Sequence, residues 1–189
     1  MSLPAQWQKH ALALIEHARS VDGDFFRSVE LSYAFPDDVI SGEGSRQYGG
    51  RFVKPGVRAV YGAAEEQAGV AEAAYRRNRL AGGSVIVELP RITYVINVKL
   101  GVAVDLTASD PDVEAILSAC LRPDHSESQD VGEFLRERGV QGIVFPSGVP
   151  GVKGTNIVVF RDVAPAPTVV LVNRDRILEE LRRLASRVP

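Results

Sequence analysis

A glycine-rich stretch in the first third of the chain limits the folds that this sequence can adopt. Residues 41–72 read SGEGSRQYGGRFVKPGVRAVYGAAEEQAGVAE. Glycine loses the most backbone freedom on folding, so ordering such a loop is costly, and the cost is usually offset by a special backbone shape or by a ligand. Because Arg46 and Arg51 lie among the glycines and Glu72 lies in a helix predicted to follow, we expect anion recognition beside a carboxylate.

This stretch differs from the common nucleotide-binding loops. A phosphate-binding P-loop needs Gly-Lys-Ser or Gly-Lys-Thr after the glycines, and none follows here. A dinucleotide fingerprint needs a helix directly after the glycines, whereas this chain passes through Pro55 into a predicted strand at 57–60 that ends at Tyr61. A glycine-rich surface turn remains an alternative interpretation of the loop taken alone.

The hydrophobic pattern predicts an irregular order of helices and strands. Helices are expected at 4–19, 65–80, 113–121, 128–138 and 174–186, and strands at 25–31, 57–60, 84–89, 92–100, 102–106, 141–145, 155–160 and 168–172. Residues 22–24 are expected to end the first helix, and 36–38 to form a turn into the glycine-rich loop. Regular strand–helix–strand alternation is absent, so the sequence predicts an α+β fold with a mixed or antiparallel sheet and packed helices.

Composition indicates an ordinary globular protein. The 189 residues are 45% apolar and 24% charged, which favours one domain spanning 1–189. The net charge of -2 gives no overall electrostatic case for binding nucleic acid or an anionic membrane. No secretion signal and no run of 18 apolar residues is found, so a cytoplasmic protein is expected.

Single residues argue against several kinds of site. Cys120 lies in the apolar pattern DVEAILSACL, which predicts a buried structural thiol. The three histidines lack zinc-type spacing, so no metal is expected. Ser147 follows a predicted strand without a GxSxG elbow, which disfavours a serine hydrolase and leaves a turn residue or a pocket residue.

Two charged residues have both a structural and a functional interpretation. Arg27 lies in an apolar strand, where a charge most often marks an edge that faces water. Glu72 lies at the border of the small-residue face of helix 65–80, where it is most often solvated. Position alone does not decide between these interpretations and a role in a site.

Several of these motifs together resemble one family. GEGSRQYGGRF, the valine run to Tyr61, Glu72 within AEAAYRR, and GIVFPSGVPGVKGTNIVVF are similar in order and spacing to RES-domain toxins of bacterial type II toxin–antitoxin systems. The resemblance covers about 25–160 and leaves helical extensions at both ends. It implies a fold similar to that of ADP-ribosyltransferases, with a cleft for NAD.

The resemblance also implies an activity and a set of site residues. RES-domain toxins degrade NAD and release nicotinamide, either as glycohydrolases that use water or as phosphorylases that use phosphate as a co-substrate. NAD is thus a substrate, and no other cofactor is implied. Carried over by motif, the catalytic candidates are Arg27, Tyr61, Glu72 and Ser147, and the substrate-binding candidates are Arg46 and Arg51.

Cleavage of NAD explains why these residue types would be gathered. Positive charge builds on the ribose as nicotinamide leaves, so the Glu72 carboxylate would stabilise the transition state more than the ground state. The guanidinium fork of Arg27 would bind the pyrophosphate or the nearby ribose, with Arg46 and Arg51 as supports. Tyr61 would stack on nicotinamide or donate to Glu72, and Ser147 would orient the ribose or the amide.

Partners, alternatives and departures complete the expectations. The resemblance implies an Xre-type antitoxin, with DNA contacted only through it, and leaves a homo-oligomer open. Two alternatives stand: transfer of ADP-ribose to a macromolecule, and a catalytically silent nucleotide-binding module. Residues 52–54 (FVK) replace a frequent tryptophan, asparagine and proline, and Lys153 replaces an arginine after the serine. These departures bear on substrate fit and on the level of catalytic activity more than on the fold.

Overall fold

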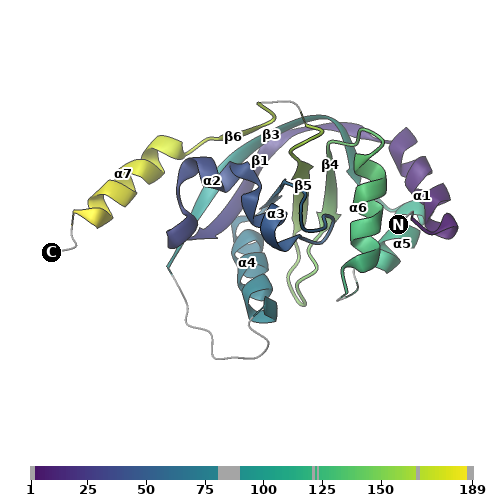
Figure 1. Cartoon of the computed structure of the whole chain (residues 1–189), viewed down its shortest axis with the longest axis horizontal. Coiled ribbons are helices and arrows are strands. Elements are labelled where there is room, and N and C mark those ends of the chain that lie inside the picture. The colour runs from purple at the N-terminus through teal and green to yellow at the C-terminus, as the bar shows by residue number, and fades with distance from the viewer. Residues whose placement is uncertain (1–2, 81–89, 121, 123, 165–166, 187–189) are drawn as a thin grey trace.

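A six-stranded mixed sheet forms the centre of the computed structural model, which describes residues 3–80, 90–120, 122, 124–164 and 167–186. The strand order is β1-β2-β5-β4-β3-β6, and β1 also pairs with β3. Helices pack around this sheet, and α7 extends away from it (Figure 1). The predicted α+β fold with a mixed sheet is therefore confirmed.

The strands are β1 Arg19–Glu30, β2 Ala59–Ala63, β3 Arg91–Asp105, β4 Gly142–Pro146, β5 Thr155–Phe160 and β6 Val169–Leu171. The helices are α1 Ala5–Glu16, α2 Pro36–Ser41, α3 Glu43–Tyr48, α4 Glu66–Leu80, α5 Pro111–Cys120, α6 Ser126–Arg136 and α7 Arg174–Ala185, with a 3-10 turn at Leu31–Tyr33.

Two short antiparallel neighbours, β2 and β5, set the frame for the site. Their register runs from Ala59 opposite Phe160 to Ala63 opposite Asn156. β4 is antiparallel to β5 and parallel to β3, while β1 and β3 form a long antiparallel pair. The pair β2 and β5 thus has an Asn156 end and a Phe160 end, and these two ends carry different side chains.

Apolar side chains are buried on both faces of β2, β5 and β4, as the near-continuous apolar runs of these strands require. One face packs with the helices α1, α5 and α6, and the opposite face packs with residues of β1, β3 and β6. The apolar cluster on the first face includes Phe52, Ile143, Phe145, Val158 and Phe160, and the cluster on the second face includes Phe25, Val60, Ile96, Ile157 and Val159.

Part of the predicted glycine-rich loop is helical, so the prediction of a turn and loop from 36 to 50 is wrong. Pro36 lies in the first turn of α2, where its missing N–H is not needed. Gly42 and Gly49 follow α2 and α3 with φ of 74° and 67°, in the left-handed region that favours glycine. The glycines therefore end two short helices.

Three strand predictions also need correction. β1 begins at Arg19 and runs through 22–24, because pairing with β3 holds this polar segment, where Asn97 Nδ2 donates to Asp24 at 2.8 Å. The separate strands predicted at 92–100 and 102–106 form the single strand β3. Tyr61 lies inside β2, not at its end. The strand predicted at 84–89 lies outside the described residues.

The sequence predictions for the long helices, β5 and Cys120 are confirmed. The five long helices α1, α4, α5, α6 and α7 occur within a few residues of their predicted positions, and β5 has the predicted bounds. Cys120 is buried, and burial raises the pKa of its thiol to about 12, which is unsuited to a nucleophile. Among the helices of the described ranges, none has the length and apolar character needed to cross a membrane.

Candidate functional site

Helix α4 carries Glu72 toward the Asn156 end of β2 and β5. The helix lies close to β1, since a Cβ at Gly69 would come within 3.2 Å of the Phe26 carbonyl oxygen. Glu65, the residue just before α4, accepts a hydrogen bond from the Thr155 amide at 3.1 Å. These two contacts fix the position of the helix, and with it the direction in which Glu72 points.

Three donors converge on one oxygen of Glu72. Ser147 Oγ donates to Oε1 at 2.7 Å, Asn156 Nδ2 at 2.8 Å and the Gly148 amide at 3.2 Å. Ser147 and Gly148 follow β4, and Asn156 lies on the neighbouring strand, so the β4–β5 pairing brings the donors together. Hydrogen bonds to a charged acceptor are stronger than neutral ones, which fixes the orientation of this carboxylate.

Arg51 lies directly beside this cluster. Its Nη1 donates to the Cys120 carbonyl oxygen at 2.6 Å. Its Nη2 is packed against Gly148, because a Cβ built there would come within 2.0 Å of it. A guanidinium group is thus adjacent to the residue whose amide donates to Glu72.

Helix α6 holds the Gly50–Arg51 backbone in place. Gln129 Nε2 donates to the Gly50 carbonyl oxygen at 2.9 Å, and Ser128 Oγ donates to the Arg51 carbonyl oxygen at 2.5 Å. Both side chains come from the first turn of the helix. The position of Arg51 therefore depends on α6.

Tyr61 and Arg27 support the same region from β2 and β1. The Tyr61 hydroxyl accepts a hydrogen bond from the Phe52 amide at 3.1 Å, and its ring lies close to Gly50, where a Cβ would meet the hydroxyl oxygen at 2.5 Å. Arg27 Nη1 donates to the Tyr61 carbonyl oxygen at 2.7 Å. Glycine at position 50 is thus required by the approach of the Tyr61 ring.

Known proteins share the sequence family and the fold of this chain. A family model described as the RES domain matches residues 24–179. The chain belongs to the RES-domain family. Among solved structures it is similar to a chain of the MbcT–MbcA toxin–antitoxin complex of M. tuberculosis, with 22% identity and a TM-score of 0.72 over 96% of this chain and 100% of the other. At that identity the similarity supports the fold alone. A search of curated protein sequences finds no match.

The RES domain brings some of the predicted site residues together and separates others. The side chains of Glu72 and Ser147 are in direct contact, and Arg51 packs against Gly148, the residue that follows Ser147. Arg27 is half-buried on β1, which pairs with β2 on one side and with β3 on the other. The alternative of an edge-strand charge in water is therefore wrong. Tyr61 contacts the Gly50 loop, and no hydrogen bond between it and Glu72 is seen in the described part of the chain.

Arg46 lies elsewhere in the RES domain. Its Nε donates to both carboxylate oxygens of Glu43, at 2.8 and 2.9 Å, within α3. It lines a hollow with Arg58 and Arg161, which flank the Phe160 end of β2 and β5. Its predicted part in substrate binding stays a prediction.

Asn156 is the site residue that sequence reasoning missed. It is 4% exposed and lies in the strand TNIVVF, among apolar residues. A buried amide needs hydrogen-bond partners, so a polar side chain in an otherwise apolar strand was the available signal. Its partner is Glu72, the residue that sequence pattern alone placed in solvent.

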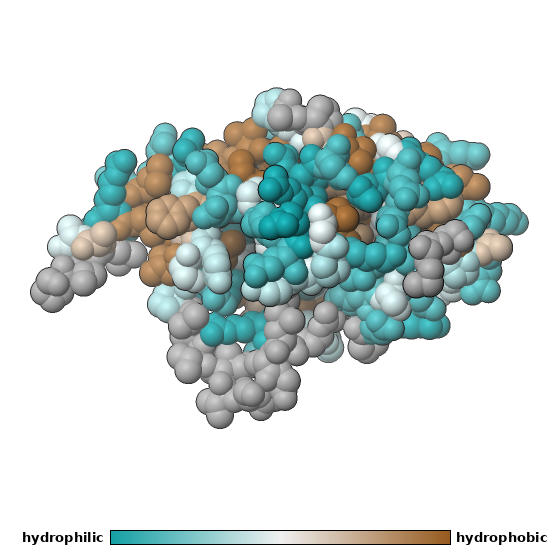
Figure 2. All heavy atoms as spheres, viewed as in Figure 1, coloured by the Kyte–Doolittle hydropathy of each residue, from teal (hydrophilic) through white to brown (hydrophobic). Residues whose placement is uncertain are grey.

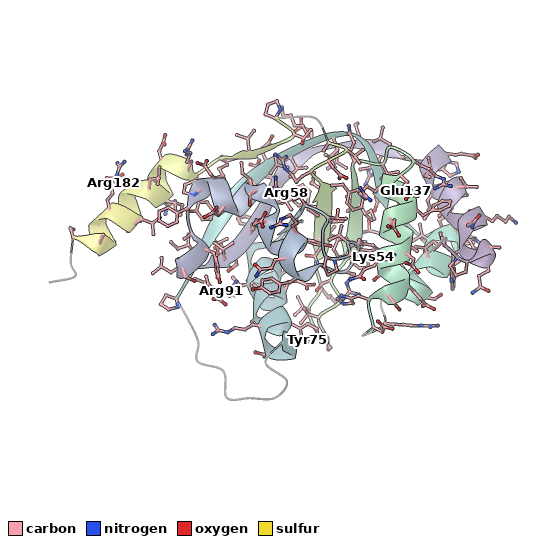
Figure 3. All side chains as sticks on the ribbon, viewed as in Figure 1. Lys54, Arg58, Tyr75, Arg91, Glu137 and Arg182 are labelled. Carbon is pink, nitrogen blue, oxygen red and sulfur yellow. The ribbon has the colours of Figure 1, made fainter. Side chains whose placement is uncertain are left out.

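The departures at 52–54 have structural roles in this RES domain. Lys54 Nζ lies 2.7 Å from both Asp130 Oδ1 and Glu133 Oε2 of α6, and these carboxylates raise the pKa of its ammonium group (Figure 3). Phe52 is buried, and α6 packs so closely on it that a Cβ at Gly132 would come within 1.9 Å of the Phe52 carbonyl oxygen. These residues fasten the glycine-rich segment to α6.

The chemistry of the site is that of one oriented carboxylate with the guanidinium group of Arg51 beside it. No group of three or more histidine, cysteine, aspartate or glutamate side chains suited to a metal is found within the described ranges. A carboxylate held by fixed donors presents negative charge without having to reorganise, and an arginine beside it favours an anionic ligand. The arrangement suits a substrate that is anionic in one part and develops positive charge in another.

Proposed function

We propose that this RES-domain protein is a toxin-like enzyme that cleaves the bond between nicotinamide and ribose in NAD. The observation that carries the proposal is the Glu72 carboxylate, held by Ser147, Gly148 and Asn156 with Arg51 beside it. NAD combines an anionic pyrophosphate with a ribose that becomes cationic as nicotinamide leaves. Membership of the RES-domain family supports the same reaction.

Glu72 acts on the developing positive charge. As the C–N bond breaks, its electron pair leaves with nicotinamide, which departs as a neutral molecule, and positive charge spreads over the ribose carbon and ring oxygen. A carboxylate near that sugar lowers the barrier because its attraction is stronger in the transition state than in the bound substrate. The three donors keep the carboxylate in one orientation throughout.

The remaining residues position the substrate. Arg51 and Arg27 are proposed to contact the pyrophosphate, for which the guanidinium fork is suited. Ser147 donates to Glu72 here and is proposed to orient the nicotinamide ribose or the amide. Tyr61 shapes the Gly50 loop, and stacking on nicotinamide is its proposed part in binding.

Water or phosphate completes the reaction. The acceptor oxygen forms a bond to the ribose carbon that nicotinamide has left, and a proton is released to solvent when the acceptor is water. The products are then nicotinamide with ADP-ribose or with its phosphorylated form. These two outcomes distinguish a glycohydrolase from a phosphorylase.

An antitoxin partner and a cytoplasmic location are part of the proposal. The similar M. tuberculosis structure is a toxin–antitoxin complex, which supports a protein partner for this chain as well. We propose a partner of the Xre type that neutralises the toxin. Expression of the chain in bacteria is expected to halt growth, and co-expression of the neighbouring gene product is expected to restore it.

The experiment that tests the activity is incubation of purified protein with NAD, with and without phosphate. Chromatography is expected to show free nicotinamide with the wild type and almost none with Glu72→Ala. Glu66→Ala, in the first turn of the same helix, is the matched control and is expected to behave as the wild type. NAD that stays intact with the wild type contradicts the proposal, and label from NAD found on a macromolecule would favour an ADP-ribosyltransferase instead.

A further inference from the structure

A hollow of about 650 Å³ lies near the Phe160 end of β2 and β5, opposite the Glu72 end. Figure 2 shows a strongly hydrophilic surface over α3 and the neighbouring segments. The polar side chains that line the hollow are Ser41, Arg46, Arg58, Arg136, Arg161 and Asp162.

The four arginines come from separate segments that the backbone holds together. The Gly56 amide donates to the Arg46 carbonyl oxygen at 2.7 Å, and the Arg161 amide donates to the Arg58 carbonyl oxygen at 3.0 Å. Arg136 comes from the last turn of α6 and pairs with Asp162. The main-chain positions from which these side chains reach the hollow are therefore fixed.

The charges of the hollow do not balance. Glu43 is shared by Arg46 and by Arg58, whose Nη2 lies 3.4 Å from Oε2, and Asp162 pairs with Arg136. Four guanidinium groups thus face two carboxylates, within a chain whose net charge is -2. Arg161 donates to the Thr168 hydroxyl over a long 3.5 Å, and burial lowers the pKa of its guanidinium group. An incoming anion would offset that burial.

The hollow is separate from the Glu72 cluster. Five residues along the chain lead from Asn156 to Arg161, which is about 16 Å at the usual strand rise of about 3.3 Å per residue. On the face between the two ends, the rings of Tyr61 and Phe52 pack against Phe145, with centroids 6.5 and 4.8 Å away. Phe52 and Phe145 are buried, so packed side chains fill this space.

We propose that this hollow is a second binding site, for the polyphosphate group of a small molecule. Its volume suits a nucleotide-sized ligand, and arginine forks match phosphate oxygens. Nucleic acid is disfavoured because the chain has a net charge of -2 and its arginines meet here in one concavity instead of along an extended basic face. The proposal does not depend on cleavage of NAD.

Titration calorimetry of the full chain with inorganic tripolyphosphate and with ATP tests the proposal. Each ligand is expected to bind once, and Arg58→Gln combined with Arg161→Gln is expected to weaken binding about tenfold or more, the factor that corresponds to about 1.4 kcal/mol. Arg182→Gln, on α7 and away from the hollow, is the matched control and is expected to bind as the wild type (Figure 3). Tighter binding of ATP would identify a nucleotide ligand, and equal affinities would identify polyphosphate alone.

A variant that changes the affinity in the opposite direction keeps the test decisive if the double variant does not fold. Glu43→Gln removes the carboxylate that competes for Arg46 and Arg58, so it is expected to tighten binding. Unchanged affinity in both Glu43→Gln and the double variant overturns the proposal. The proposal is also overturned if Arg51→Gln weakens binding and the double variant does not, because that result would locate the ligand beside Glu72. Tighter binding of a short DNA or RNA strand than of tripolyphosphate overturns it as well.

Discussion

The two ends of β2 and β5 hold their charged groups in different ways. At the Asn156 end, one half-buried carboxylate, Glu72, accepts hydrogen bonds from three donors. At the Phe160 end, four arginines share two carboxylates, and Glu43 serves both Arg46 and Arg58, the two that are exposed. One end is oriented by neutral donors, and the other is held by ion pairs that water and salt weaken.

The difference teaches which end is suited to chemistry and which to binding. A fixed carboxylate can act on a charge that exists only in the transition state, because its donors are already in place. A group of arginines with an excess of positive charge attracts an anion without acting on a reacting bond. We therefore place the proposed reaction at the Glu72 end and the proposed anion binding in the arginine hollow.

The largest effect is expected from a variant that disturbs both ends at once. Gly132→Ala places a Cβ 1.9 Å from the backbone oxygen of Phe52, which cannot move aside as a flexible side chain would. We expect a loss of about 2–4 kcal/mol in the free energy of unfolding, within the range of severe core changes. Denaturant unfolding measures it, and a stability equal to that of the wild type would show that α6 is free to shift.

A second variant affects only the Glu72 end. Asn156→Ala removes one donor and lets the Glu72 carboxylate turn, so NAD cleavage is expected to fall about tenfold to a hundredfold, as when an oriented polar contact is lost. Polyphosphate binding should not change. Steady-state kinetics and calorimetry check the two effects, and unchanged cleavage would mean that Ser147 and Gly148 suffice to hold Glu72.

The role of Arg51 can be tested through its neighbour. Gly148→Ala brings a Cβ within 2.0 Å of Arg51 Nη2, the flexible end of that side chain, so the guanidinium group should move with little effect on folding. We expect KM for NAD to rise about threefold to tenfold, since one arginine–phosphate contact is weakened. A change in kcat with KM unaltered would count against Arg51 as a substrate-binding residue.

The smallest effect is expected at Lys54, away from both ends. Lys54→Met removes ion pairs to Asp130 and Glu133 that are part exposed, so we expect a loss of at most about 1 kcal/mol in stability. The carboxylates raise the pKa of Lys54 above its ordinary 10.5, so this contribution is present below that pH and is lost as pH rises through the raised value. Thermal unfolding at pH 7 and at a pH above the raised pKa should show a smaller difference between variant and wild type at the higher pH.

Sequence reasoning predicted that Glu72 and Ser147 share a site, and the structure brings these two side chains into contact, but the rest of the arrangement was not predicted. The motifs around Glu72 and Ser147 predicted that both residues belong to the site, because the spacing of these motifs matches that of the family. Asn156 was missed because hydrophobic alternation treats it as one position in an apolar strand, and its partner lies 84 residues away along the chain. The position of Arg46 was not predictable either, since two short helices, ended by glycines, replace the expected loop and direct it to the opposite end.

The most direct test of the account compares two glutamates, one at each end. Glu72→Gln and Glu43→Gln make the same chemical change, and each removes one negative charge from a cluster of polar groups. We predict that nicotinamide release from NAD falls at least about a hundredfold with Glu72→Gln, the magnitude typical of a lost electrostatic contact in the transition state, and stays at the wild-type rate with Glu43→Gln. Equal rates for the two variants, or a larger loss with Glu43→Gln, would contradict the assignment of the reaction to the Glu72 end.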